Sequence, residues 1–346
     1  MVLTGALPAV GKNGARYRSE REERGVRVRW ARRKVFAFAV TAALTLATTG
    51  GPGGAGVAGA ARARSPLPAP ADLTPFTARY PGGLGIYRPV GRRVDGHPAL
   101  YVTWLRLPDQ PSTVVGVAWM DTHLLRAQLY SGSLSPGGLY WRRTAPVSPS
   151  AARTLVAAFN GGFLMKDSHG GYLSEGHLVA PLVRGGASLV IYRDGSANVG
   201  AWGVDVGMTP RVVAVRQNLT LLVDHGRPVP GLVASDVSRW GSSLNNVVDT
   251  PRSGLGVTRD GALVYVEGPM SIVDLARVLV RAGAVRAMAL DMNPFWTIFA
   301  YYTPAGPRGL ATPGNGHRLN STMVQSPDRF FQVSYARDFV TMSAAG

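Results

Sequence analysis

The strongest constraint on the fold is a succession of short apolar runs, broken by turn residues, that begins at about residue 73. The stretches ALYVTWLRL (99–107), TVVGVAWMD (113–121) and LLRAQLYSG (124–132) alternate in polarity or run apolar, as strands do. Three further segments place Asp-Gly or Asp-x-Gly between β-rich runs: SLVIYRDGSANVG, LTLLVDHGRPVPG and GLGVTRDGALVYVEG. Such turn residues favour hairpins, so we expect three of them here.

Helices are predicted at only two places. Ser148 opens a short helix that leads into a buried strand from Leu155 to Phe159. The clearer helix covers 271–283, because Ser271 and Asp274 form an N-terminal cap and Gly283 stops it. Strand VRAMAL follows and ends at Asp291. We therefore expect one α+β domain over 73–346, with a mixed β-sheet, several hairpins and few helices, to which residues 73–147 add strands.

The first 60 residues have the pattern of an export segment. A basic stretch precedes 14 apolar residues, from Val35 to Thr48, which is short of the roughly 20 that span a bilayer. Ala58-Gly59-Ala60 offers a cleavage site, and Arg32-Arg33 resembles a twin-arginine signal. We expect a protein that is exported by a Sec-type or twin-arginine signal and is then secreted or associated with the cell envelope. If the segment is not cleaved, it is expected to act as an N-terminal anchor and to be the only contact with the membrane. Residues 61–72, rich in Ala, Pro and Arg, are predicted to be a linker.

Composition excludes several classes of chemistry. The chain of 346 residues has no cysteine, which rules out disulfides, thiolate catalysis and cysteine-bound zinc. Its formal charge of +17 favours anionic partners, but no Arg/Lys-dense helix with interleaved aromatics predicts nucleic-acid binding. His169 and His177 lie eight residues apart in one loop, a spacing unlike that of helical metal ligands. We expect neither a metal nor a cofactor.

Three segments, in this order, resemble the phosphodiester glycosidase family: AAFNGGF with Asn160 to Phe163, PRSGLGVTRDG with Arg252, and AMALD with Asp291. The resemblance covers about 150–300. It implies hydrolysis of a sugar linked through a phosphodiester. The family usually follows its Asp with Gly-Gly-Gly-Ser, whereas this chain has Met292-Asn293-Pro294-Phe295-Trp296. Proline removes an amide donor and the aromatics add bulk, so the glycine cradle is lost.

The resemblance implies catalytic roles for two residues. Asp291 is expected to be the catalytic carboxylate; the alternative is an acid that caps the turn at Asn293. Arg252 is expected to clamp a phosphate; the alternative is a structural ion pair with Asp249 or Asp291. Glu175, in the Gly-rich loop GGYLSEGHL, is the candidate for a second carboxylate, or else a solvated loop acid.

The remaining candidates are substrate-binding residues. Asn160, Gly161 and Gly162 follow a buried strand, so their amides are predicted to hold an anionic oxygen; the alternative is a tight turn with positive φ. Phe163 and Asn293 flank this site. Trp296 is expected to stack on a sugar ring, with Phe295, Trp202 and Trp240 as further candidates or as packing residues.

The sequence thus predicts an exported phosphodiester glycosidase-like hydrolase that acts on a sugar-1-phosphodiester or a related phosphorylated or anionic glycan of the envelope. A phosphate leaves as a weakly basic anion, so one carboxylate, one arginine and an anion nest can suffice. Two alternatives stay open: an inactive relative that binds glycan or polyanion without cleaving it, and an unrelated β-rich scaffold.

Overall fold

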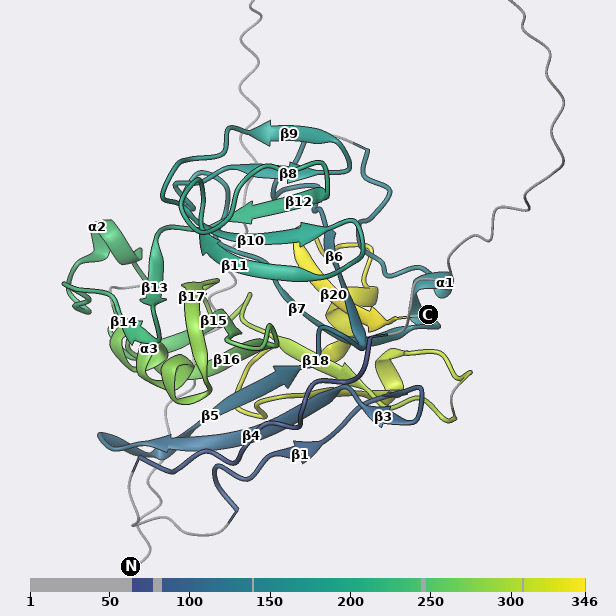
Figure 1. Ribbon diagram of the computed structural model, residues 1–346, viewed down its shortest axis with the longest axis horizontal. Coiled ribbons are helices and arrows are strands. Elements are labelled where there is room, and N and C mark those ends of the chain that lie inside the picture. The colour runs from purple at the N-terminus through teal and green to yellow at the C-terminus, as the bar shows by residue number, and fades with distance from the viewer. Residues whose placement is uncertain (1–63, 77–82, 139, 244–246, 307, 346) are drawn as a thin grey trace, which may run out of the picture. The chain divides into compact units, whose positions relative to one another are not determined.

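The computed structural model describes residues 64–76, 83–138, 140–243, 247–306 and 308–345. These residues belong to one compact unit, Ala60–Gly346, in which strands dominate and helices are few (Figure 1). The predicted α+β domain is therefore confirmed, with β-structure as the main component.

The described residues form three sheets and a small ribbon. The first sheet has eight strands, in the order β1 (Arg88–Pro89), β4 (Leu100–Leu107), β5 (Gln110–Met120), β16 (Leu263–Met270), β15 (Thr250–Thr258), β17 (Ala284–Ala289), β13 (Leu221–Asp224) and β14 (Arg227–Pro228). The second has five, in the order β11 (Ala197–Ala201), β10 (Ala187–Tyr192), β12 (Val212–Gln217), β8 (Tyr172–Ser174) and β9 (His177–Ala180). The third also has five, in the order β19 (Gly316–Arg318), β18 (Phe299–Tyr302), β7 (Leu155–Asn160), β20 (Phe339–Ala344) and β6 (Leu125–Tyr130). The ribbon pairs β2 (Arg93–Val94) with β3 (His97–Pro98).

All the ladders between these strands are antiparallel, whereas the sequence analysis predicted a mixed sheet. The longest helix among the described residues, α3 (Ile272–Arg281), connects β16 to β17. A helical crossover usually joins parallel neighbours, but here β15 lies between the two strands and pairs antiparallel with both.

The local predictions hold where sequence signals are strongest. α3 begins after Ser271, whose hydroxyl accepts from the Asp274 amide at 3.1 Å, and Gly283 follows its end with φ of +88°. α1 (Pro149–Ala152) begins after Ser148 and leads into β7. Each predicted hairpin forms: β10 with β11, β13 with β14, and β15 with β16. The described residues also form the short helices α2 (Val237–Trp240), η2 (Pro313–Asn315) and η3 (Pro327–Phe331).

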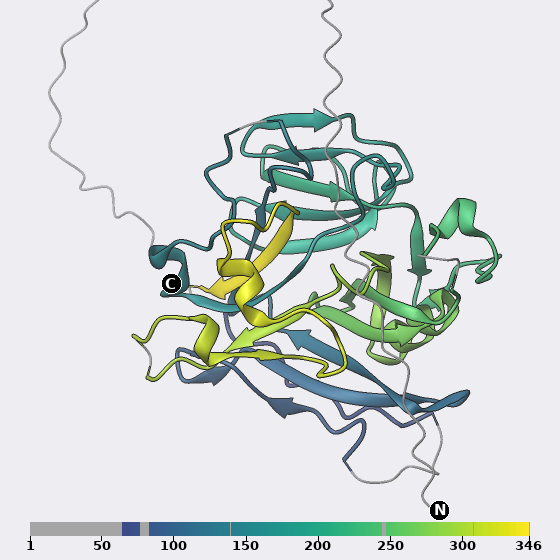
Figure 2. The same cartoon turned by 180° about the vertical axis from the view of Figure 1, so that it is seen from behind.

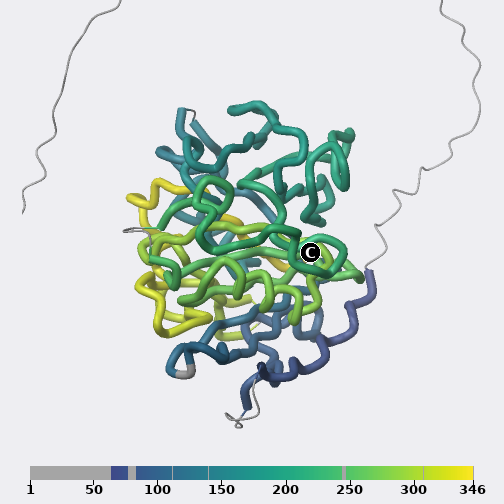
Figure 3. Tube along the Cα trace, turned by 90° about the vertical axis from the view of Figure 1, so that its left-hand side faces the viewer, coloured from purple at the N-terminus to yellow at the C-terminus, as the bar shows by residue number. Residues whose placement is uncertain are grey.

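The main core draws on all three sheets. Met120 of β5, Phe159 of β7, Leu189 of β10 and Leu255 of β15 belong to one buried cluster. Seen from behind, β20 lies between β6 and β7 in the middle of the molecule (Figure 2). The tube view places the N-terminal strands and the teal segment of β8 to β12 at opposite ends of the body (Figure 3). Residues 73–147 therefore add strands to a shared core, as predicted.

The structure corrects the predicted linker. Within 61–72, residues 64–72 are described and lie on the body: the Leu67 amide donates to Asp121 at 2.8 Å, and Arg64 pairs with Asp194 at 3.1 Å. Apolar contact explains this, since Leu67 packs against the cluster that contains Leu73. The predicted export segment lies outside the described residues. In the described part of the chain, no helix is long and apolar enough to cross a membrane.

Candidate active site

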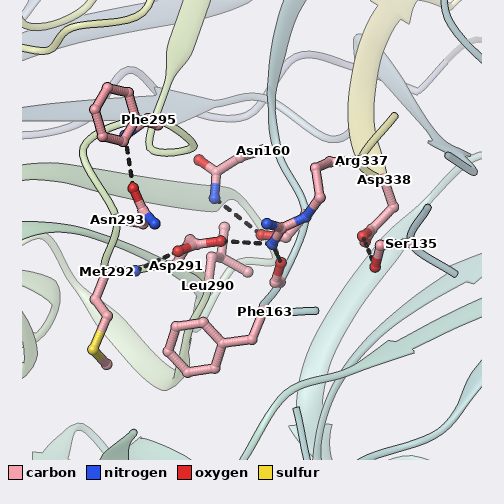
Figure 4. Close-up of polar contacts among 12 residues, drawn as sticks. Ser135, Asn160, Phe163, Leu290, Asp291, Met292, Asn293, Phe295, Arg337 and Asp338 are labelled. Atoms are coloured by element: carbon pink, nitrogen blue, oxygen red, sulfur yellow. Dashed lines mark hydrogen bonds and ion pairs between the residues drawn. The ribbon is translucent and has the colours of Figure 1, made fainter. Parts of the chain in front are cut away.

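Asp291 follows the last residues of β17 and is buried, with 5% of its surface exposed. Its Oδ1 accepts from the Met292 amide at 2.8 Å, and its Oδ2 accepts from Nη2 of Arg337 at 2.8 Å (Figure 4). The carboxylate therefore bonds to its own turn, as the capping alternative predicted, and also forms a buried ion pair that the sequence analysis did not anticipate.

Burial raises the pKa of Asp291 to about 6, although Arg337 and the Met292 amide oppose the shift. The negative charge of nearby Asp338 adds to the rise in pKa. A carboxyl group with this pKa is mostly ionised at neutral pH but exchanges its proton readily. Asp291 is thus suited to act as a base or a nucleophile near pH 7.

Arg337 comes from the segment just before β20. It donates to the Gly162 carbonyl at 2.9 Å as well as to Asp291, and its guanidinium lies 4.7 Å from the ring centre of Trp296. Within the described residues, its Nη1 has no acceptor. Arg337 therefore has a donor left for an anionic oxygen, in a position fixed by the ion pair and the aromatic face.

Arg252 lies near this centre in a different role. It directs Nε at the Met270 carbonyl (3.0 Å), Nη2 at the Val248 carbonyl (3.3 Å) and Nη1 at the Met292 sulfur (3.5 Å). Asp291 pairs with Arg337 instead, and Asp249 acts on Arg252 as a nearby charge that raises its pKa, without an ion pair between them, so the ion-pair alternative is wrong. Burial lowers its pKa to about 10, which keeps it charged at neutral pH. Because each nitrogen already meets a protein atom, Arg252 supports the loop after Asp291, and the predicted clamp role fits Arg337 better.

Asn160 connects the first motif to Asp291. Its Nδ2 donates to Ser253 Oγ at 3.0 Å, and Ser253 Oγ in turn accepts from the Asp291 amide at 3.2 Å. The Ser253 amide donates to the Asp291 carbonyl at 2.7 Å. Asn160 and the residue after Arg252 thus hold the backbone of Asp291, so the three predicted motifs do converge on one place.

A fully buried acid, Glu267, lies at the far end of this series of hydrogen bonds. Asn160 Oδ1 accepts from the Ile298 amide (3.2 Å) and from the Tyr265 hydroxyl (2.7 Å). The same hydroxyl lies 3.2 Å from Glu267 Oε2, to which it can also donate. Burial raises the pKa of Glu267 to about 8, which agrees with a neutral group. Hydrogen bonds therefore connect Glu267 to the backbone of Asp291 through Tyr265, Asn160 and Ser253.

Gly161 and Gly162 are small for a reason other than the two that the sequence analysis offered, an anion-binding nest and a tight turn with positive φ. Neither residue has positive φ, so the tight-turn alternative is wrong. The Gly161 amide donates to the Asp338 carbonyl at 3.0 Å, which leaves it unable to bind an anion. A Cβ on Gly161 would lie 2.1 Å from Asp338 Oδ2, and one on Gly162 would lie 2.9 Å from the Arg216 guanidinium carbon. Both positions are small because the Arg216–Asp338 ion pair, 2.7 Å long and buried, packs against them.

Backbone amides after Asp291 are also occupied. Met292 donates to the Asp291 carboxylate, and Phe295 donates to Asn293 Oδ1 at 2.9 Å. Trp296 and Thr297 both donate to the Asn293 carbonyl. Pro294 has no amide hydrogen. The loop that replaces the glycine run thus has little backbone left to cradle a phosphate, and anion recognition passes to Arg337.

A cavity of about 570 Å³ opens beside Asp291. Predicted residues Asp291, Phe163, Asn293 and Trp296 line it, together with His169. The remaining lining residues are Leu164, Asp167, Val237, Ser238, Gly241, Ser242, Ser243, Met292 and Arg337. Its volume is typical of a small-ligand site. Asp167 and His169 are exposed, and they supply the cavity's other titratable side chains besides Asp291 and Arg337.

Glu175 is not part of this cavity. Its carboxylate accepts from the amides of Arg142 (3.0 Å) and Arg143 (2.7 Å), and its side chain is only 6% exposed. Both the second-carboxylate prediction and the solvated-acid alternative are therefore wrong. The acid fixes the 142–143 backbone, and it faces a different cavity.

Of the four aromatic candidates, only Trp296 lines the cavity. Arg337 and Arg329 both lie over its ring, at 4.7 and 5.2 Å from the centre, so it orients arginines and is a poor free platform for a sugar. Trp240 is buried, Trp202 packs in a separate cluster, and Phe295 is 53% exposed away from the lining. The described residues contain no group of three acidic or histidine side chains placed to hold a metal.

Sequence reasoning missed Arg337, Asp338, Arg216 and Glu267. Arg337 and Asp338 are adjacent and precede the last strand, and this Arg-Asp pair is the signal in the sequence that could have pointed to them. Glu267 stands within a strand of apolar residues, VYVEGPM, where an acid is unexpected unless it has a buried partner.

Residues 153–291 match the phosphodiester glycosidase family. The predicted resemblance is confirmed for this segment. It begins just before β7 and ends at Asp291, so it holds all three motifs but not Arg337. The family match supports a hydrolase of the glycosidase type.

Among solved structures, the chain is similar to the zebrafish N-acetylglucosamine-1-phosphodiester alpha-N-acetylglucosaminidase catalytic domain auto-inhibited by its pro-peptide, with 15% identity and a TM-score of 0.45. That match covers 75% of this chain and 88% of the other. A hypothetical protein from Synechocystis gives 13% identity and a TM-score of 0.39, covering 74% and 64%. No curated protein matches.

Proposed function

We propose that this protein is an exported phosphodiester glycosidase-like hydrolase that releases a sugar from a sugar-1-phosphodiester or a related anionic glycan of the envelope. The observation that carries the proposal is the buried Asp291–Arg337 pair, which faces a cavity of ligand size at the end of the family segment. The basic, signal-like N-terminus supports export.

The chemistry follows from the charges. When the bond between the sugar and the phosphate breaks, the phosphate leaves as a weakly basic anion. Its departure therefore needs positive charge more than it needs a proton. Arg337 supplies that charge through its remaining N–H groups. Asp291, ionised at neutral pH, either attacks the anomeric carbon or takes a proton from the attacking water. Asp167 and His169 are the groups in the cavity that can move a second proton.

The loop after Asp291 favours a second candidate function, which is binding without cleavage. Its amides are occupied by the protein, and a donor array that would stabilise charge on a departing phosphate is absent from residues 292–297. If Arg337 alone cannot provide enough stabilisation, the cavity will hold an anionic glycan without hydrolysing it.

Turnover separates these two functions. The full chain is incubated with a panel of sugar-1-phosphodiesters, and released reducing sugar is measured for wild type, Asp291→Asn and the control Asp109→Asn. Asp109 is exposed and has no ion pair in the described structure. We expect Asp291→Asn to lower turnover by about a hundredfold or more, and the control to match wild type. Equal turnover in all three proteins would refute the role of Asp291, and saturable binding with no release would establish the second function.

A further inference from the structure

A second cavity, of about 670 Å³, lies between β6 and the strands β8, β10 and β12. It shares no lining residue with the cavity at Asp291. The second cavity includes the Arg-Asp-Gly turn at 193–195 and Glu175, two features that the candidate active site leaves unused.

The charges around the second cavity are unbalanced. Its lining contains two acids, and both already have cationic partners: Asp194 pairs with Arg64 (3.1 Å) and Arg211 (2.9 Å), while Glu175 pairs with Arg142 (4.0 Å) and accepts two backbone amides. By contrast, the guanidinium groups of Arg126 and Arg143 have no hydrogen bond and no ion pair among the described residues. Nη1 of Arg126 is shielded from solvent, which makes its lack of an acceptor costly.

Strand β6 and the turn at 193–195 fix the position of Arg126. It stands two residues before Gln128 on β6, so both side chains leave the same face of the strand and both line the cavity. Gly195 has φ of +78°, and a Cβ there would lie 2.4 Å from Cδ of Arg126. The turn therefore leaves room for the arginine stem, while the Ala127 amide ties β6 to the Gly195 carbonyl at 2.8 Å.

We propose that the second cavity binds a phosphorylated sugar. Two guanidinium groups without acceptors match a phosphate, which accepts paired N–H donors with good geometry. The Gln128 amide offers both a donor and an acceptor for sugar hydroxyls, and the apolar walls formed by Leu173 and Ile191 suit a ring. This site does not depend on turnover at Asp291.

Hydrogen–deuterium exchange with glucose 1-phosphate as the probe tests the proposal on the full chain. We expect the ligand to slow exchange in β6 and in residues 193–195. Arg126→Gln and Arg143→Gln should each weaken this protection, with affinity falling about tenfold. Arg227→Gln, which removes the same charge from an exposed position on β14, should leave both unchanged. Because Arg143 is exposed, its variant tests the site even if Arg126→Gln impairs folding.

Three results would overturn the proposal. The first is no protection of β6 and the 193–195 turn at any glucose 1-phosphate concentration used. The second is equal weakening by Arg227→Gln, which would indicate a general charge effect. The third is inorganic phosphate binding as tightly as glucose 1-phosphate, which would exclude a sugar subsite.

Discussion

Replacing Glu267 with glutamine tests the hydrogen-bond chain that holds Asp291. Glutamine has nearly the same shape as a protonated glutamic acid, and its amide can donate to Tyr265 while its oxygen accepts from the Asn320 amide, as Glu267 Oε1 does at 3.1 Å. The substitution therefore keeps the neutral hydrogen-bonding pattern and removes only the ability to ionise.

The magnitude follows from the pKa of Glu267, which burial raises from the ordinary value of 4.5 to about 8. Because the folded state holds this proton more tightly than the unfolded state, the stabilisation is complete below pH 4.5 and is lost as pH rises through 8. Each pKa unit corresponds to about 1.4 kcal/mol. At pH 7, where the unfolded glutamate is ionised, Glu267→Gln should raise the free energy of unfolding by about 3 kcal/mol.

Urea unfolding followed by tryptophan fluorescence, repeated from pH 4 to pH 9, measures this difference. We expect wild type and Glu267→Gln to have nearly equal stability at pH 4 and to diverge as pH rises. The exposed Asp109→Asn variant should follow wild type throughout. A difference between Glu267→Gln and wild type that stays constant with pH would refute a neutral Glu267. Lower stability of Glu267→Gln at pH 7 would refute the raised pKa of Glu267.

Other predictions concern the ion pairs around the cavity. If Asp291 must be ionised for turnover, activity should rise with pH and be half-maximal near 6, the value to which burial raises its pKa. Arg337→Gln removes the charge that lowers this pKa, so the midpoint of the pH–rate profile should move upward and turnover should fall by about 10²–10³-fold; an unmoved midpoint would contradict the pairing. Gly162→Ala forces a methyl group against Arg216 and should cost about 1–3 kcal/mol in urea unfolding, whereas Gly207→Ala, with open space around it, should cost less.

Local structure could be predicted because its causes lie close together in the chain. The Ser271 cap, the apolar face of α3 and the Gly283 stop act within a few turns of helix, and the Asp-Gly turns act within four residues. The order of the three motifs also indicated where the chain would gather around Asp291. That prediction holds, since Asn160 donates to Ser253 and Ser253 bonds to the backbone of Asp291.

The roles of the charged residues could not be predicted in the same way. The sequence predicts Glu175, in its Gly-rich loop, as a second carboxylate of the site, yet its carboxylate is bound by the amides of residues 142 and 143. Arg252 belongs to a motif, but its donors face carbonyls and a sulfur. A charged side chain pairs with whatever lies near it in space, and its long stem can point either way, so spacing in the chain does not fix its partner.

The sequence by itself determined that this chain would be a β-rich domain with one long helix, and that a carboxylate would end the strand after that helix. Only the tertiary structure decided that Arg337, 46 residues further along, would pair with Asp291, and that Glu267 would stay neutral behind it. The physical reason is that strand propensity and turns depend on neighbouring residues. Ion pairing and pKa depend on burial, which arises only when the three sheets pack together.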